Sequence, residues 1–270
     1  MFPATTLSIC TLLVALHGGG DVPDQKGPPA APAAKGATAK AAERPDPLAE
    51  ANRLKRSAAG QEGEAKHAAL LAAAAEYEKV AKGAGEEGAL VAEASFRAGE
   101  LWRTLKREEE AQRCFERATA HVAAAPRVAA RAWLELGHAQ RRAKQFDAAE
   151  RLYQRVLSIV PEQRRESAMA LGWQGKSLLA KGELAQGHAL LLAVGARYPE
   201  FRTDDIRHVD QVACDWIEAN RREEARALVA DCLARHAEPD EGDEEVDAAV
   251  RRALDKMKSR KLLLEPPAKQ

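Results

Sequence analysis

The sequence predicts an all-α protein built as an α-solenoid of about five helical hairpins. Three observations favour this fold class. Apolar residues recur at helical spacing from 48 to 239, and residues of the same kind recur every 38 positions. The period-two alternation and Asn-Gly turns typical of strands are absent. A repeat of this length is typical of an array in which each hairpin buries its apolar face against the next.

Residues of the same kind that recur at the 38-position step form columns. Three columns show the repeat most clearly, two on the predicted second helices and one on the predicted first helices. The bulky column contains Tyr77, Phe115, Tyr153, Leu191 and Val229. The small column beside it contains Ala73, Ala111, Ala149, Gly187 and Ala225. On the first helix the small residues are Gly99, Gly137, Gly175 and Ala213. Helices approach closely where one of them offers a small residue, so we expect Gly137 to face Ala149.

The clearest unit runs from 131 to 161, and Pro161 stops its second helix. The unit resembles the tetratricopeptide repeat, whose pattern it matches at Trp133, Leu136, Gly137, Ala149, Tyr153, Val156 and Pro161. This resemblance implies a right-handed superhelix of antiparallel hairpins with a protein-binding surface. The usual unit has about 34 residues, so the longer period here implies longer connections between hairpins. The first unit departs from the pattern, because Gly60 and Gly63 interrupt its first helix.

Long connections and segments such as Arg197-Tyr198-Pro199-Glu200 also resemble exported repeat proteins of bacterial envelopes, including the Tol-Pal coordinator and outer-membrane assembly lipoproteins. The short apolar run in residues 1–20 agrees with export, because its length suits a signal peptide and is too short to span a bilayer. The sequence therefore favours a periplasmic location. The alternative is an uncleaved apolar segment on a cytoplasmic protein.

Residues 21–47 contain six prolines, many alanines and no large apolar residue. Such a composition predicts a disordered linker between the N-terminal segment and the repeat domain at 48–239. After an acidic turn, residues 240–262 form an apolar stripe with acidic residues at its start and basic residues at its end. We expect this segment to be a helix that caps the open end of the array, followed by a disordered tail at 263–270.

Charge and cysteine content limit the function classes. Lys and Arg together number 41, as do Asp and Glu, so the balance argues against general nucleic-acid binding. No two cysteines have the Cys-x-x-Cys spacing of zinc or redox motifs. We expect Cys232 to be a small buried residue of the core, and pairing of Cys214 with Cys232 is left open.

Two stretches imitate nucleotide-binding motifs. Residues 170–177 fit a relaxed phosphate-loop pattern, and residues 83–88 spell a dinucleotide fingerprint. Both motifs require a preceding strand, and here they follow or lie within predicted helices. The histidines and carboxylates show no catalytic or metal-ligand spacing either. We therefore predict no catalytic residue, no metal site and no cofactor.

A binding surface on the first helices is what the resemblance implies. The residues predicted to face the groove are Arg103, Arg131, Leu134, His138, Arg141, Arg142 and Lys176. This basic surface with apolar interruptions suits an extended peptide that carries carboxylates. The alternative is that these side chains form an ordinary solvated face.

The repeat pattern and the N-terminal composition lead to two function hypotheses. The first is a noncatalytic scaffold that binds a protein or peptide segment in its groove. The second is an accessory or regulatory subunit of a larger envelope or cell-wall assembly, tethered by the Pro-rich N-terminus.

Overall fold

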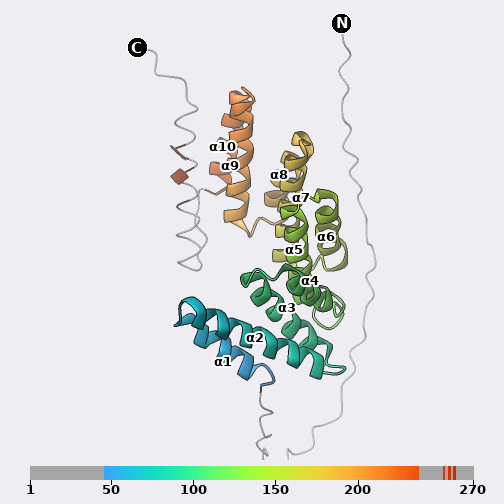
Figure 1. Cartoon of the computed structure of the whole chain (residues 1–270). Helices are drawn as coiled ribbons and strands as arrows, with labels where there is room; N and C mark the ends of the chain where they lie inside the picture. Colours follow the sequence, from blue (N-terminus) through green and yellow to red (C-terminus); the bar gives the residue numbers. More distant parts are fainter. Residues whose placement is uncertain (1–45, 237–251, 253–254, 257, 260–270) are drawn as a thin grey trace, which may run out of the picture. The chain divides into compact units, whose positions relative to one another are not determined.

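The structure is a computed structural model that describes residues 46–236 together with 252, 255, 256, 258 and 259. Within this part of the chain all regular structure is helical, and the successive helices pair into five hairpins (Figure 1). The pairs are α1 (Ala49–Ala59) with α2 (Gly63–Gly83), α3 (Gly88–Thr104) with α4 (Glu108–Thr119), α5 (Pro126–Arg142) with α6 (Phe146–Ile159), α7 (Arg164–Lys181) with α8 (Leu184–Arg197), and α9 (Arg202–Glu218) with α10 (Arg222–Arg235). The predicted all-α solenoid of five hairpins is confirmed.

The 38-residue period is visible in the helix boundaries. The first helices of the last four hairpins begin at 88, 126, 164 and 202, and their second helices begin at 108, 146, 184 and 222. The first hairpin departs from this register, since α1 ends at Ala59 and α2 begins at Gly63. The two glycines that interrupt the sequence pattern therefore lie at the turn, which shortens α1 and lengthens α2.

Each of the four regular hairpins turns through one residue with positive φ. Lys106, Lys144 and Asn220 have φ of 59°, and Gly182 has φ of 87°. After α5, the Lys144 N–H donates to the Arg141 carbonyl at 3.0 Å and the Gln145 N–H to the Gln140 carbonyl at 2.9 Å. This is the Schellman pattern that satisfies the last carbonyls of a helix. The turn is thus fixed by backbone geometry, and the residue at the left-handed position varies.

The glycines of the first helices make room for bulky side chains of the second helices. A Cβ placed on Gly99 would lie 2.6 Å from the Phe115 ring, and one placed on Gly137 would lie 2.5 Å from the Tyr153 ring. The nearest atoms to Gly137 therefore belong to Tyr153, where Ala149 was expected. In the next hairpin the small residues of the two helices do face each other. A Cβ placed on Gly175 would lie 2.9 Å from the Gly187 carbonyl oxygen.

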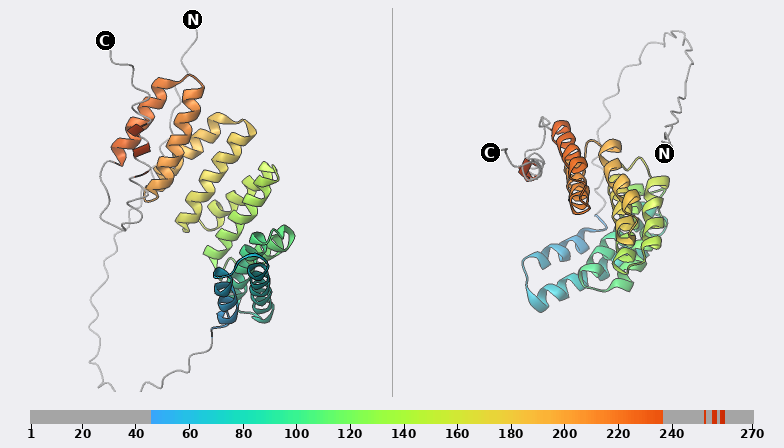
Figure 2. Two further views of the ribbon diagram at one scale, coloured as in Figure 1. Left: turned by 60° about the vertical axis from the view of Figure 1, so that its left-hand side comes forward. Right: turned by 90° about the horizontal axis from the view of Figure 1, so that it is seen from above.

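The hairpins stack in sequence order (Figure 2), and each second helix packs against the first helix of the next hairpin. Among the first helices, α3 also packs against α5 and α5 against α7. The corresponding approach of α7 and α9 is almost absent at the level of the backbone. The buried residues between hairpins are mainly Ala, Leu, Val and single aromatics. The last hairpin is consequently joined to the array chiefly through α8.

Several predicted segments lie outside the described residues: the signal peptide at 1–20, nearly all of the linker at 21–47, and the tail at 263–270. Of the predicted capping helix at 240–262, residues 252, 255, 256, 258 and 259 are helical. The Lys256 ammonium lies 2.6 Å from the carboxylate of Asp210 on α9. Among the described helices, none is both long and apolar enough to cross a bilayer.

The contact between Gly137 and Tyr153 predicts a conditional effect of substitution. Gly137→Ala should lower the free energy of unfolding by about 1–2 kcal/mol, because overpacking outweighs the gain in helix propensity. In a Tyr153→Val background, Gly137→Ala should lower the free energy of unfolding only a little, because the last hairpin already combines Ala213 with Val229 at the corresponding positions. Denaturant titration of the four proteins measures this coupling. An equal cost of Gly137→Ala in both backgrounds would contradict the assigned contact.

Candidate functional site

Three of the arginines predicted to face a partner are already paired with carboxylates of neighbouring helices. The pairs are Arg103 with Glu135, Arg131 with Glu100 at 3.4 Å, and Arg142 with Glu108 at 3.3 Å. The Arg131 guanidinium also lies 4.2 Å from the centroid of the Phe96 ring. Each pair joins the α5–α6 hairpin to the one before it. These arginines therefore act first as links between hairpins.

Two more of the predicted residues are buried, Leu134 fully and His138 in part. Leu134 is only 3% exposed and packs in the central apolar cluster, so it offers no surface to a partner. His138 shares a hydrogen bond of 2.9 Å with the Tyr153 hydroxyl and meets the Trp173 ring edge-on at 4.7 Å. Burial, followed by the nearby arginines, lowers the pKa of His138 to about 4, so the ring is neutral at physiological pH.

Arg141 and Lys176 differ from the other predicted cations. The Arg141 guanidinium lies 4.8 Å and the Lys176 ammonium 4.4 Å from the centroid of the Trp173 ring. Within the described residues, neither cation has a carboxylate in ion-pair contact, and the buried Arg141 Nε has no hydrogen-bond partner. Burial and the charge of Arg141 lower the pKa of Lys176. The two cations thus form an unneutralised pair beside an aromatic ring.

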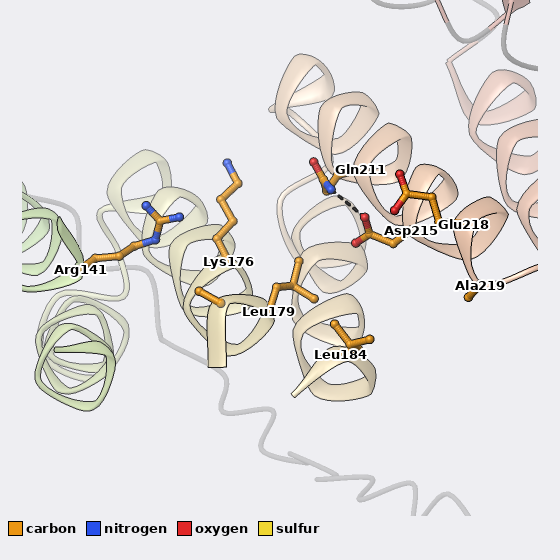
Figure 3. Close-up of a pocket in the computed structure, with 9 residues that line it drawn as sticks. Arg141, Lys176, Leu179, Leu184, Gln211, Asp215, Glu218 and Ala219 are labelled. Atoms are coloured by element: carbon orange, nitrogen blue, oxygen red, sulfur yellow. Dashed lines mark hydrogen bonds between the residues drawn. The ribbon is translucent and has the colours of Figure 1, made fainter. Parts of the chain in front are cut away.

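This cation pair lines a cavity of about 650 Å³ between α7 and α9, which we call the α7–α9 groove. Figure 3 shows Arg141 and Lys176 on one side and Gln211, Asp215 and Glu218 of α9 on the other, with two leucines between them. The complete lining is Arg141, Lys176, Leu179, Ala180, Leu184, Gln211, Asp215, Glu218 and Ala219. Leu184 is 55% exposed, an unusual state for a large apolar side chain in this array. The groove therefore has one basic wall, one acidic wall and an apolar floor.

The acidic wall is held in place by a hydrogen-bond chain. The Gln211 amide donates to Asp215 Oδ1 at 2.9 Å, and His188 Nε2 lies 2.8 Å from Asp215 Oδ2. Trp216 Nε1 donates to His188 Nδ1 at 3.3 Å, so His188 carries its proton on Nε2 and donates it to Asp215. Glu218 is exposed at the end of α9. Asp215 thus has a fixed position, whereas the Glu218 carboxylate faces solvent.

The groove opens where one column of the repeat changes. The buried residues Ala94, Ala132 and Ala170 occupy equivalent positions on α3, α5 and α7, and the next member of this column is His208 on α9. A Cβ on Gly172 would lie 2.7 Å from the His208 ring, so Gly172 makes room for this histidine. A bulky, partly polar ring thereby replaces the alanine face that lets α5 and α7 approach. The separation of the α7 and α9 backbones coincides with this change.

Residues 130–163, which comprise α5 after its first turn and all of α6, match the family model described as Tetratricopeptide repeat. The chain contains a tetratricopeptide repeat. The matched segment begins at Ala130 and covers the unit that the sequence pattern identified, including Gly137, Tyr153 and Pro161. No protein of curated function matches the chain. Tetratricopeptide repeats are generally noncatalytic scaffolds for protein interactions, and this repeat supplies Arg141 to the groove.

The repeat positions predicted the basic wall and Leu179 of the floor, but they missed the acidic wall and Leu184. Asp215, Glu218 and Leu184 belong to later helices, and their approach to Arg141 depends on how the hairpins stack. One signal was present in the sequence, because His208 breaks a column of three alanines at the 38-residue step. The apparent phosphate loop at 170–177 lies inside α7, where backbone N–H groups are already bonded within the helix.

A buried cluster in the last hairpin resembles a metal site in composition. Ligand atoms of Asp205, Cys232 and His236 lie within 4.8 Å of one another. However, Asp205 Oδ2 already accepts hydrogen bonds from Arg235 at 2.5 Å and His236 at 2.8 Å. Burial, followed by the charge of Asp205, raises the pKa of the Cys232 thiol to about 12, so the thiol stays protonated in this network. We interpret the cluster as an ion-pair network that joins the start of α9 to the end of α10.

The two other cysteines are also accounted for in the described structure. Cys114 is buried against α2 and α3 in the core of the first two hairpins. Cys214 and Cys232, whose pairing the sequence left open, are not joined by a disulfide.

The buried His208 predicts a specific pH dependence of stability. Burial and the neighbouring Lys176 lower its pKa to about 4, whereas the unfolded side chain has a pKa of about 6.5. The unfolded chain therefore takes up a proton first, and stability present above pH 6.5 is lost as the pH falls toward 4. We expect His208→Gln to lose about 1–2 kcal/mol less stability than the wild type between pH 7 and pH 5. Denaturant titration at both pH values measures the difference, and parallel losses in the two proteins would contradict the assignment.

Proposed function

We propose that this protein is a noncatalytic interaction scaffold that binds an acidic segment of a partner protein in the α7–α9 groove. The observation that carries the proposal is the unneutralised cation pair of Arg141 and Lys176. The other three arginines predicted to face a partner, Arg103, Arg131 and Arg142, are instead paired with carboxylates across the boundary between two hairpins. A partner carboxylate would supply the missing counter-charge through charge-assisted hydrogen bonds.

The surroundings of the cation pair support a binding role over a solvated face. Trp173 holds both cations close to its ring, so their positions are restricted before a partner arrives. Leu184 leaves an apolar side chain exposed on the same groove. An exposed leucine beside oriented cations is the combination of an apolar anchor and polar contacts that recurs at protein interfaces.

Export and tethering belong to the same proposal, and they rest on the sequence alone. The apolar segment at 1–20 and the Pro-rich linker at 21–47 would place the repeat array outside the cytoplasm and at a distance from its attachment point. The accessory-subunit hypothesis has no separate structural observation in its favour.

A paired charge reversal tests the function. The full chain carrying Arg141→Glu and Lys176→Glu should bind a partner captured by the wild type at least about tenfold more weakly. The matched control carries Arg151→Glu and Arg155→Glu, which reverse two exposed cations on the second helix α6. Circular dichroism should show equal helix content in all three proteins, and titration with the purified partner gives the affinities. Equal affinities for the wild type and the groove variant would overturn the proposal.

A further inference from the structure

The α7–α9 groove contains charges of both signs, and this distribution restricts the chemistry of its occupant. Arg141 and Lys176 extend from α5 and α7, whereas Asp215 and Glu218 extend from α9 (Figure 3). The ion pairs of the described structure include none across the groove, and Asp215 is instead bonded by Gln211 and His188. A partner that carries only acidic residues would meet attraction on one wall and repulsion on the other.

The floor between the walls determines which backbone conformation fits. It consists of Leu179, Ala180, Leu184 and Ala219, which offer no hydrogen-bonding side chain. An extended peptide on this floor would lose water from its backbone N–H and C=O groups without gaining protein partners, at a cost of about 1–3 kcal/mol for each buried group. A helix satisfies these groups internally and presents only side chains. The floor therefore favours a helical occupant.

We propose that the α7–α9 groove recognises an amphipathic helix with an apolar stripe between one acidic edge and one basic edge. The apolar stripe would pack on Leu179 and Leu184. The acidic edge would face Arg141 and Lys176, and the basic edge would face Asp215 and Glu218. This inference rests on the proposed binding function and adds the charge pattern and conformation of the bound segment.

The two charged edges also set the direction in which the helix binds. Turning such a helix end over end exchanges the sides on which its edges lie, so one of the two orientations brings like charges together on both walls. Like-charge contacts disfavour that orientation. The groove accordingly selects both a sequence pattern and a direction.

A displayed library of helix-forming peptides tests the inference on the full chain. The peptides should have about 16 residues, since shorter isolated helices are marginal in water, with a fixed leucine stripe and random residues on both edges. We expect the wild type to enrich peptides with opposite charges on the two edges. Glu218→Lys should shift the enrichment toward peptides that are acidic on both edges, because the solvent-facing carboxylate of the acidic wall becomes a cation while Asp215 stays bonded by Gln211 and His188. The control Glu162→Lys reverses an exposed charge in the turn between α6 and α7 and should enrich the wild-type pattern.

Affinities of single enriched peptides then quantify the switch. Glu218→Lys should lower the affinity for the peptide with oppositely charged edges about three- to tenfold. It should raise the affinity for the peptide with two acidic edges by a similar factor, as expected for exposed charge pairs. Enrichment of all-acidic peptides by the wild type, or no change of preference in Glu218→Lys, would overturn this inference and leave the proposed function standing. If the wild type enriched peptides no more than the variant carrying Arg141→Glu and Lys176→Glu, both this inference and the proposed function would be overturned.

Discussion

The close approach of two helices at a small residue is the contact on which the three central hairpins of this protein depend. Gly99 and Gly137 leave space for the rings of Phe115 and Tyr153, and Gly175 meets the backbone of Gly187. The buried side chains between hairpins are mainly Ala, Leu and Val with single aromatics, and the small residues fix how tightly the two helices of a pair close. Each hairpin has an apolar face that the next hairpin covers. A packing defect in one hairpin therefore also disturbs the packing of its neighbours. The repeated residues therefore serve first to pack the hairpins together, and the binding surface depends on that packing.

Ion pairs then join the hairpins that packing has brought together, and they explain why most of the basic residues are poor candidates for partner contacts. Arg127 reaches the buried Glu166 at 3.1 Å, and Arg165 reaches Asp204 at 3.1 Å, each across a boundary between hairpins. Isolated exposed pairs contribute little stability, but they do neutralise charge on the surface. The groove between α7 and α9 is where this compensation fails. There a histidine interrupts the alanine column, the backbones separate, and charges of both signs face a shared cavity.

Local sequence rules predicted the fold well because the information for each hairpin is local. Glycine and aromatic positions recur in phase, and the helix starts of the last four hairpins follow the same step. The candidate site was predicted only in part, since Arg141 and Lys176 lie in the repeat pattern while Asp215, Glu218 and Leu184 reach them only through stacking. The burial of Leu134 was missed because a position that faces a groove in a regular array lies in the core when α5 and α7 approach closely. Charge pairing between hairpins, which removes Arg103 and Arg142 from the groove, likewise depends on geometry that spacing alone does not contain.

We propose above all that binding occurs where the regular stacking of first helices ends. Hydrogen–deuterium exchange of the full chain, with and without a bound helical peptide of opposite charged edges, tests this location directly. We predict that the peptide slows exchange in the C-terminal half of α7, the first turn of α8 and the C-terminal half of α9, which line the groove. Protection confined to the outer helices α4 and α6, or spread evenly over all five hairpins, would contradict the proposed location.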